Sequence, residues 1–321
     1  MDKSVLEFST AVKKGVSVIT CSVDPELCNK MIESVKKTIG TDFETIVFDN
    51  REKNLGICQV YNYCAQKSKY SYLCFIHEDI IMPSKNWGKT MVEFADKTPD
   101  CGIIGFAGCT IASKNFISWW WEYGKGRCRF YDPKYSGKAY SLDDLSYKYD
   151  NPANEEFAKV VTLDGLFLFV AKDVWKEYPF DEERIKGFHF YDADFSFRIA
   201  LNRQNYVCLT SDIYHFSRGN YEKIYYEYAR IFQKKWKKTL PFSVEKQKIR
   251  IIAETNNGFN FLIQSIRLGF TIKDSVKHFL EINGLFSIFV LLTIKIGEII
   301  KKGIKFLTPY GIVKLWQRMK K

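Results

Sequence analysis

The sequence predicts an α/β protein with an open, mainly parallel sheet flanked by helices, followed by a helical and basic C-terminal extension. Three observations predict it. Apolar strand patterns alternate with helix patterns over residues 15–80, which is typical of a parallel sheet covered by helices. Of the 321 residues, 46% are hydrophobic, enough to bury a substantial core. The net charge of +11 comes from residues 221–321, which hold 20 Lys and Arg against 7 Asp and Glu.

Short apolar runs and helix-start signals mark the elements of the N-terminal part. Each predicted strand is an apolar run that ends in polar residues, and the three runs lie at 16–20, 45–48 and 72–76. Asp24 and Pro25 predict the start of a helix that runs toward Gly40, because an acidic cap and a first-turn proline favour helix starts. Residues 56–66 predict the next helix.

The same alternation continues further along the chain, with one irregular interruption. Strands are predicted at 103–106, 160–163 and 206–209, a further apolar run lies at 166–170, and helices are predicted at 172–177 and from 191 or 192 to 202. Residues 119–152 show no clear period, so we expect a long loop that is functional or partly disordered. We therefore expect one domain over residues 1–220 and a separate helical region over 221–321.

The C-terminal region ends in two patterns of different kinds. The apolar run 286–294 stops at Lys295 and is far shorter than the ~20 residues that a membrane-spanning helix needs. Beyond it, Lys and Arg alternate at helical spacing with apolar residues that include Trp316. A basic amphipathic helix of this kind is typical of an interfacial membrane anchor, so an anionic membrane surface is the partner we expect. A helix packed on the rest of the chain or on a second subunit is the alternative.

Cysteine spacing and charge distribution argue against several classes of protein. The nine cysteines form no C-x-x-C pair and several lie in apolar runs, so we expect buried free thiols rather than a disulfide framework or a zinc cluster. Residues 1–220 hold 28 Lys and Arg against 30 Asp and Glu, a balance that does not support a nucleic-acid groove. The first residues open no apolar stretch that resembles a signal peptide, so we expect a cytoplasmic location.

Polar residues follow each of the first three predicted strands. They are Thr20 and Cys21, Asp49 and Asn50, and His77, Glu78 and Asp79. In open parallel sheets ligands bind beyond the carboxyl ends of the strands, so these residues should converge on one edge. Three ionisable residues directly after an apolar strand favour a ligand site, and a solvated loop is the alternative.

Asp79 is the metal-ligand candidate of the third group. One ligand that such an edge could bind is a nucleoside diphosphate. Its phosphates need a divalent cation to neutralise them, and hard cations prefer carboxylate oxygens. His77 or Glu78 could contact the ribose or a metal-bound water. His215, which follows the last predicted strand, is a second ligand candidate, because one histidine among oxygen ligands is compatible with Mn²⁺. A purely structural histidine is the alternative.

Two acids stand at the start of a predicted helix. Asp192 and Asp194 lie close to His189, and a carboxylate held there could act as a general base toward an acceptor hydroxyl. Helix capping is the alternative, because acids at a helix N-terminus satisfy free N–H groups. The two acids are about 200° apart around a helix axis, so only one of them can face a substrate. Trp119, Trp120 and Trp121 are candidate stacking surfaces for an acceptor sugar, a membrane-interface belt or plain core.

Taken in order, these segments resemble the GT-A glycosyltransferases, in particular the bacterial family 2-like enzymes. The resemblance covers roughly residues 15–220. Its matching pieces are Thr20-Cys21, Asp49-Asn50, the lead-in from Asn54-Leu55-Gly56 to Asn62, His77-Glu78-Asp79, Leu163-Asp164-Gly165 and Tyr191-Asp192-Ala193-Asp194. The chain departs from the family pattern at two positions. His77 stands where the family normally has the first Asp of Asp-x-Asp, and Tyr191 stands where it often has Glu.

The resemblance implies a Rossmann-like GT-A sheet and a metal-dependent, inverting transfer of a sugar from a nucleoside-diphosphate donor. The implied acceptor is a saccharide or a lipid-linked molecule, in surface polysaccharide or glycan synthesis. Mn²⁺ or Mg²⁺ would be held by Asp79 and His215, with Asp192 as the catalytic base and Asp194 in support. The implied donor-binding residues are Thr20, Cys21, Asp49, Asn50, Gly56, His77, Glu78 and Asp79. The implied acceptor-binding residues are Asp164, Gly165, Trp120, His189 and Asp194.

Two other functions remain open from the residues alone. A sugar-1-phosphate nucleotidyltransferase would use a similar sheet and a metal-binding carboxylate. It normally carries a Gly- and Arg-rich loop after the first strand, however, and residues 21–25 do not form one. A non-catalytic sugar-nucleotide-binding protein is the second alternative.

A lipid-linked acceptor would bring the protein to the inner face of the cell membrane, where basic C-terminal helices would bind anionic lipid.

Overall fold

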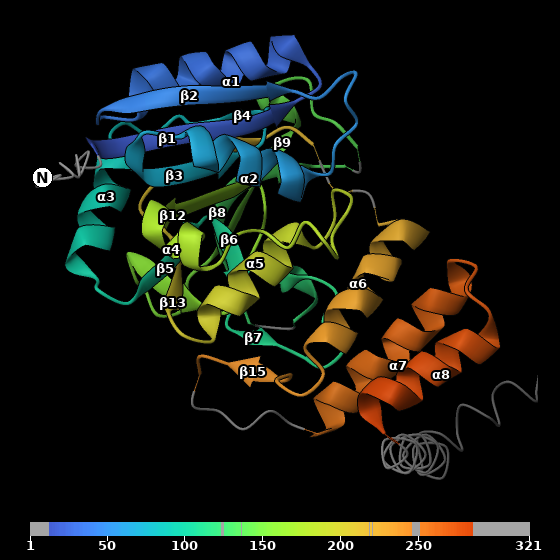
Figure 1. Cartoon of the computed structure of the whole chain (residues 1–321). Helices are drawn as coiled ribbons and strands as arrows, with labels where there is room; N and C mark the ends of the chain where they lie inside the picture. Colours follow the sequence, from blue (N-terminus) through green and yellow to red (C-terminus); the bar gives the residue numbers. More distant parts are fainter. Residues whose placement is uncertain are drawn as a thin grey trace, which may run out of the picture. The chain divides into compact units, whose positions relative to one another are not determined.

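The chain divides into two compact units. The computed structural model describes residues 13–122, 125–135, 137–217, 219, 221–245 and 251–284. One unit is Met1–Ala112 with Phe116–Lys246, and the other is Ser113–Asn115 with Gln247–Lys321 (Figure 1). The sequence predicted a domain boundary at residue 220, but the first unit extends past it. The reason is α6 (Lys223–Lys235), whose Phe232 packs on Phe116 and whose Lys235 pairs with Asp194.

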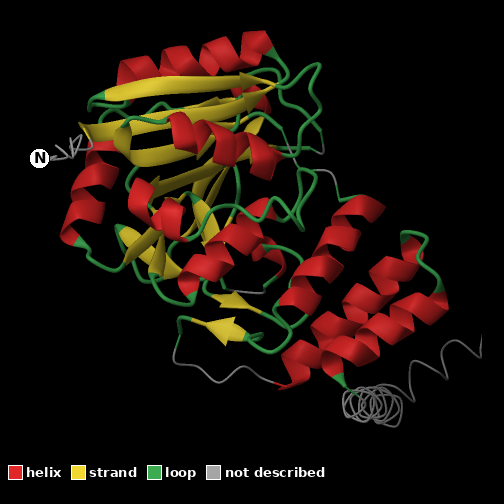
Figure 2. Ribbon diagram, viewed as in Figure 1, coloured by secondary structure: helices red, strands yellow, loops and turns green. Residues whose placement is uncertain are grey.

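Within the described residues, the larger sheet of the first unit has seven strands in the order β10-β13-β5-β12-β3-β1-β2. Figure 2 shows the strands in yellow and the helices in red. Their bounds are β1 Lys13–Ser22, β2 Phe43–Asp49, β3 Tyr70–Ile76, β5 Cys101–Gly105, β10 Phe157–Val160, β12 Phe167–Ala171 and β13 Gln204–Cys208. β1 is parallel to β2 and β3, and β5 is parallel to β13. Only β12 and β10 run antiparallel to their neighbours. Five strands therefore share one direction, which confirms the predicted open, mainly parallel sheet.

Helices cover both faces of this sheet. Their bounds are α1 Pro25–Thr38, α2 Ile57–Lys67, α3 Trp87–Lys97, α4 Lys172–Glu177 and α5 Tyr191–Ala200. One core cluster joins Val18 of β1 to α1 and α3, and a second joins Ile19, the next residue, to α2, α4 and α5. Successive strand residues face opposite sides of a sheet, so each side needs apolar residues and the strand becomes a continuous apolar run.

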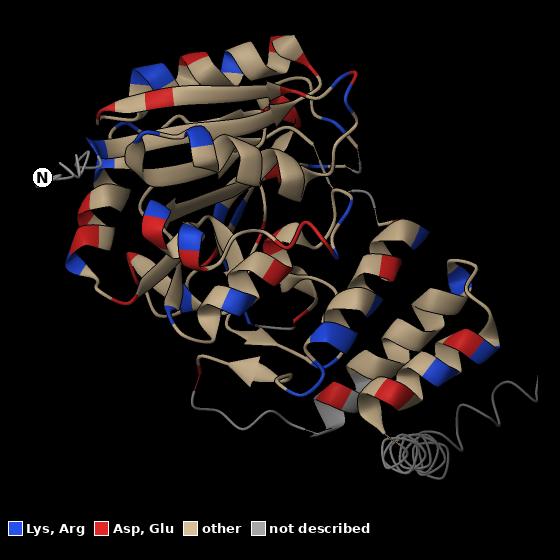
Figure 3. Cartoon of the chain, viewed as in Figure 1, with Lys and Arg blue, Asp and Glu red and all other residues tan. Residues whose placement is uncertain are grey.

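Both signs of charge occur along α1 and α6 (Figure 3).

The predicted start of the first helix is confirmed. The Asp24 carboxylate accepts hydrogen bonds from the backbone N–H groups of Glu26 and Leu27, at 3.0 and 3.2 Å, and Pro25 is the first helical residue. This cap satisfies two of the N–H groups that the first turn leaves free. The β1–α1 connection therefore has a fixed shape at the carboxyl end of β1, where the sequence places a ligand site.

A second sheet of the first unit has the order β11-β6-β8-β14-β4, with β9 paired to β8. Its strands are β4 Ile80–Ile81, β6 Ala107–Cys109, β8 Gly126–Pro133, β9 Leu145–Asp150, β11 Thr162–Leu163 and β14 Tyr214–His215. A short pair, β7 (Ile111–Ala112) with β15 (Phe242–Ser243), forms a third sheet, and Trp119–Trp121 and Leu142–Asp144 are single 3₁₀ turns.

The expectation that residues 119–152 lack regular structure was wrong. β8 and β9 lie within this stretch and pair antiparallel over residues 128–133 and 145–150. Buried and partly exposed residues alternate along β8, as in Arg127-Cys128-Arg129-Phe130, because only one side of this pair faces the interior. A search for continuous apolar runs therefore misses both strands.

The second unit contains α7 (Ile251–Arg267) and α8 (Ile272–Asn283). Thr271 caps α8 by accepting a hydrogen bond from the backbone N–H of Asp274. Asn115 and Asn283 exchange side-chain hydrogen bonds, which ties the short segment 113–115 to α8. Among the described residues, no helix is long and apolar enough to cross a membrane. The predicted apolar run 286–294 and the amphipathic pattern after it lie outside the described residues.

Candidate active site

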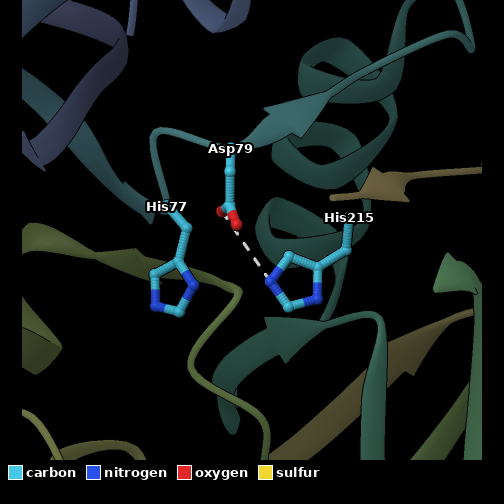
Figure 4. A group of neighbouring side chains, drawn as sticks. All are labelled: His77, Asp79 and His215. Atoms are coloured by element: carbon cyan, nitrogen blue, oxygen red, sulfur yellow. Dashed lines mark ion pairs between the residues drawn. The ribbon is translucent and has the colours of Figure 1, made fainter. Parts of the chain in front are cut away.

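Three side chains beyond the end of β3 form a cluster that could hold a metal ion. They are His77, Asp79 and His215, and one ligand atom from each lies within 4.8 Å of the others. Figure 4 shows the two imidazole rings on either side of the Asp79 carboxylate. The cluster exists because β4 pairs with β14, which places Ile80 opposite His215. The backbone N–H of Phe216 also donates to the carbonyl of Asp79, at 3.1 Å.

The orientation of His215 fits a metal ligand. Its Nδ1 faces Asp132 of β8 at 3.5 Å, and its Nε2 lies 3.7 Å from Asp79 Oδ1. Nε2 is buried and has no hydrogen-bond partner among the described residues. A buried polar atom without a partner is costly, and a bound cation would remove that cost. A histidine ligand whose other nitrogen contacts a carboxylate is the usual arrangement in metal sites.

The electrostatics of the cluster favour positive charge. Burial lowers the pKa of His215, but Asp79 and Asp132 more than offset this, so the pKa lies above its ordinary value. Burial raises the pKa of Asp79, but His215 and His77 outweigh burial and hold it below its ordinary value. Burial also lowers the pKa of His77, which keeps that ring neutral near pH 7. The Asp79 carboxylate and the neutral His77 imidazole are in the protonation states that bind a divalent cation, and the negative charge that favours a proton on His215 would favour a bound cation in the same way.

The first residues of α5 connect this cluster to the predicted base. Nε2 of His77 lies 2.7 Å from the Tyr191 hydroxyl, which donates to the carbonyl of Gly165 at 3.1 Å. The backbone N–H of Gly165 donates to Asp192 Oδ2 at 2.9 Å. Glycine is needed at position 165, because a Cβ there would lie 2.1 Å from the Tyr191 oxygen.

Asp192 lines a cavity of about 700 Å³. Burial, together with the charge of Asp164, raises the pKa of Asp192 to about 7. Asp164 is fixed by the Trp119 indole N–H at 2.8 Å and by the backbone N–H of Leu166 at 3.0 Å. A carboxylate whose pKa lies near neutrality is suited to accept a proton at physiological pH.

A second cavity, of about 530 Å³, lies on the side of β1 and α1. Cys21, Glu78 and Asp79 contribute to its wall, whereas His215 lines only the larger cavity. His77 and Tyr191 line both cavities. The three candidate ligands therefore lie where the two cavities meet.

Four predicted donor-binding residues line the smaller cavity: Cys21, His77, Glu78 and Asp79. Glu78 also has a local role. Its carboxylate accepts hydrogen bonds from the Ser22 hydroxyl at 2.6 Å and from the backbone N–H of Asp24 at 2.9 Å. Glu78 therefore holds the β1–α1 connection against the end of β3.

The other four predicted donor-binding residues do not line that cavity. Thr20 is buried, and Asp49 forms an exposed pair with Arg51. Asn50 holds a turn by exchanging two hydrogen bonds of 2.9 Å with the backbone of Leu55. Gly56 allows a close backbone approach, because a Cβ there would lie 2.2 Å from the carbonyl oxygen of Lys186. For Asn50 and Gly56 the structure gives a folding role.

Of the predicted acceptor-binding residues, Asp164, Gly165, Trp120 and His189 line the larger cavity with Asp192, whereas Asp194 does not. Asp194 is 1% exposed, and its carboxylate binds Lys235 Nζ at 2.7 Å and the Trp236 indole N–H at 2.8 Å. This places Asp194 in the contact between α5 and α6.

Trp119 was predicted only as one of three stacking candidates, and Asp132 and Tyr191 were not predicted as site residues. Each acts by contacting a predicted residue from a distant part of the chain, namely Asp164, His215 and His77. The alternation along β8 is the signal that could have placed Asp132 on the cavity side.

A comparison with sequence families gives the class of protein to which the chain belongs. Residues 17–236 match the family described as "Glycosyltransferase like family". The match covers most of the chain, and the protein belongs to this family. No curated protein matches the sequence.

Solved structures that resemble the chain in fold include GalNAc-T7, TarS and A197. GalNAc-T7, crystallised with UDP, GalNAc and Mn²⁺, has 13% identity and a TM-score of 0.48, over 84% of this chain and 55% of that one. Residues 1–349 of TarS from S. aureus have 15% identity and a TM-score of 0.47, over 83% of this chain and 80% of that one. A197 from STIV has 13% identity and a TM-score of 0.36, over 64% of this chain and 86% of that one.

Proposed function

We propose that this glycosyltransferase is metal-dependent and inverting, and that it moves a sugar from a nucleoside-diphosphate donor to a saccharide or lipid-linked acceptor. The observation that carries the metal dependence is the buried Nε2 of His215, which faces Asp79 beside His77 and has no hydrogen-bond partner in the part of the chain that the structure describes. A divalent cation on these residues, Mn²⁺ or Mg²⁺, would neutralise the phosphate oxygens of the donor.

The two cavities suggest separate places for donor and acceptor. The smaller one, at the carboxyl ends of β1 and β3, would hold the nucleotide, since ligands of such sheets bind at that edge. The larger one contains Asp192 and exposes Trp120, an aromatic face on which an acceptor sugar can stack. The anomeric carbon of the donor would lie at their junction, beside His77.

Asp192 would act as the general base. Its carboxylate accepts the proton of an acceptor hydroxyl while that oxygen forms a bond to the anomeric carbon from the face opposite the diphosphate. The bond between the anomeric carbon and the phosphate oxygen breaks, the diphosphate carries away the electron pair, and the configuration is inverted. The Gly165 N–H fixes the carboxylate in place, so much of the rate enhancement comes from positioning.

A panel of donors tests this function against its rivals. We expect Mn²⁺-dependent hydrolysis of at least one UDP-, GDP- or dTDP-sugar, and loss of that hydrolysis in Asp79→Ala. A nucleotidyltransferase would instead release pyrophosphate from a sugar 1-phosphate and a nucleoside triphosphate. A non-catalytic binding protein would bind a donor without hydrolysing it, and either result would overturn the proposal.

We also propose that the basic C-terminal part brings the enzyme to an anionic membrane surface in the cytoplasm, where lipid-linked acceptors for polysaccharide synthesis would be met. The support is compositional: residues 221–321 hold 20 Lys and Arg against 7 Asp and Glu. Each basic residue near an anionic surface contributes about 1 kcal/mol to binding.

A further inference from the structure

His77 has two ring nitrogens, and the structure gives them different surroundings. Nε2 lies 2.7 Å from the hydroxyl oxygen of Tyr191. The other nitrogen, Nδ1, lies on the side of the ring that faces Asp79 and His215 (Figure 4). A neutral imidazole carries one proton, and only the nitrogen without it can bind a metal. The position of that proton therefore decides whether His77 can serve as a ligand.

The Tyr191 hydroxyl has one hydrogen and two polar neighbours. It lies 3.1 Å from the carbonyl oxygen of Gly165, which can only accept, and 2.7 Å from Nε2 of His77. If the hydroxyl donates to Gly165, then Nε2 must carry the proton and donate it to the Tyr191 oxygen. The opposite arrangement would bring two oxygens together at 3.1 Å with no hydrogen between them, and it would leave the Gly165 carbonyl without this bond.

Packing makes this arrangement rigid. Tyr191 is 4% exposed, and its ring contacts Tyr61 and Phe180. Gly165 has no side chain, which lets the hydroxyl approach its backbone closely. Burial raises the pKa of Tyr191 well above its ordinary value, so the hydroxyl keeps its hydrogen over the working pH range.

We propose that Tyr191 is a positioning residue that fixes the proton of His77 on Nε2, so that the free Nδ1 completes a three-ligand metal site with Asp79 and His215. The inference rests on the proposed metal dependence and extends it to a residue that is not itself a metal ligand. It also connects the two positions where the chain departs from the pattern it resembles. His77 and Tyr191 are hydrogen-bonded to each other. The tyrosine at one of these positions therefore fixes the histidine at the other.

The same hydroxyl connects the metal site to the base. Tyr191 immediately precedes Asp192, and its partner Gly165 donates its N–H to the Asp192 carboxylate. Loss of the hydroxyl should therefore affect metal affinity first and the placement of Asp192 second. Phenylalanine keeps the ring packing, so Tyr191→Phe isolates the hydroxyl without leaving a cavity.

The histidine proton can be observed directly in the metal-free protein. The chain has four histidines, so long-range ¹H–¹⁵N spectra of their rings at about pH 8 are simple, and His77→Gln identifies the His77 signals. We expect the proton of His77 on Nε2 in the wild type. In Tyr191→Phe we expect a mixture of the two proton positions. A wild-type proton on Nδ1, or an unchanged Nε2–H state in Tyr191→Phe, would overturn the inference.

Mn²⁺ affinity, measured by calorimetry without any sugar donor, gives the second readout. Outer-shell partners of metal-bound histidines typically contribute 10- to 100-fold in affinity, so we expect a loss of that size in Tyr191→Phe. Tyr225→Phe is the matched control. Tyr225 also lines the larger cavity, and its hydroxyl donates to the backbone carbonyl of Ile117 at 2.7 Å, but no hydrogen bond joins it to His77 among the described residues. Equal affinities for wild type and Tyr191→Phe would overturn the inference.

The two readouts separate this inference from the proposed function. If the wild type binds no Mn²⁺, the proposed metal dependence fails, and the proton on His77 is still decided by the spectra. If the wild type binds Mn²⁺ and Tyr191→Phe binds it equally well, only the role of Tyr191 fails.

Discussion

Replacing Asp192 by Asn separates the chemistry of transfer from donor binding. Asn keeps the shape of the side chain and can still accept the Gly165 N–H, but it cannot take a proton at neutral pH. We expect kcat and kcat/KM for transfer to fall together by about 10²–10⁴-fold, with the Kd for the nucleotide nearly unchanged.

The pH dependence of transfer gives a second magnitude. Burial and the neighbouring Asp164 raise the pKa of Asp192 to about 7 in the metal-free protein, and a cation in the adjacent site would lower it. The wild-type rate should therefore rise with pH and level off near or below about pH 7, falling roughly tenfold for each pH unit below the midpoint. Asp164→Asn removes the like charge, so its midpoint should move to lower pH.

Stability should change in the opposite direction to activity. The folded-state pKa of Asp192 lies above its unfolded value, so its contribution to stability is full below about pH 4 and is lost as pH rises through about 7. Ionising this buried group costs on the order of 4 kcal/mol at most. Asp192→Asn avoids that cost, so its Tm should exceed that of the wild type at about pH 8 and match it more closely at about pH 5.

Steady-state transfer assays over pH 5–9 and thermal melts at the two pH values check these expectations. Transfer by Asp192→Asn within a few-fold of the wild type would refute the assignment of the base. A rate that does not change with pH below 7 would refute the ionisation argument.

Two further substitutions and one deletion test the role of Asp194, the metal ligand His215 and the membrane-binding tail. Asp194→Asn should lower the free energy of unfolding by about 1–3 kcal/mol, measured by urea unfolding, because it weakens a buried pair with Lys235. It should leave the pH profile of transfer unchanged, and an altered profile would exchange the roles of Asp192 and Asp194. His215→Ala should raise the Mn²⁺ concentration for half-maximal donor hydrolysis at least about tenfold while Tm stays within a few degrees, whereas loss of the fold would make His215 structural. Deleting residues 284–321 should abolish sedimentation with anionic vesicles and preserve donor hydrolysis; a truncated protein that still sediments with vesicles contradicts the membrane proposal.

Sequence patterns predicted the larger sheet mainly because its central strands are buried on both faces. Val18 and Ile19 belong to different core clusters, so their strand is an unbroken apolar run that can be recognised locally. β8 and β9 escaped prediction because one side of the pair carries polar and tyrosine side chains. A strand with one polar face is recognised by the alternation of apolar and polar residues. In β8 and β9 that alternation is short and interrupted.

The site was predictable only where a residue's chemistry and its place at a strand end or helix start coincide. Asp79, His215 and Asp192 were named for that reason, and helix geometry separated Asp192 from Asp194. His77 kept several possible roles, because its partner Tyr191 is 114 residues away in the chain. Asn50 and Gly56 stay predictions as donor-binding residues, and the structure also gives each of them a local role. Their places near strand ends suggested donor contacts, and their hydrogen bonds and close backbone approaches also serve the fold.

We propose that His77, Asp79 and His215 hold a divalent cation that binds the donor's diphosphate. Calorimetric titration of UDP into the wild type, with Mn²⁺ and with EDTA, tests this metal site most directly, with Asp79→Ala as the matched variant. We expect tight binding only for the wild type with Mn²⁺, and affinity that collapses with EDTA or in Asp79→Ala. Equal UDP binding with and without metal, or undiminished binding by Asp79→Ala, would contradict it.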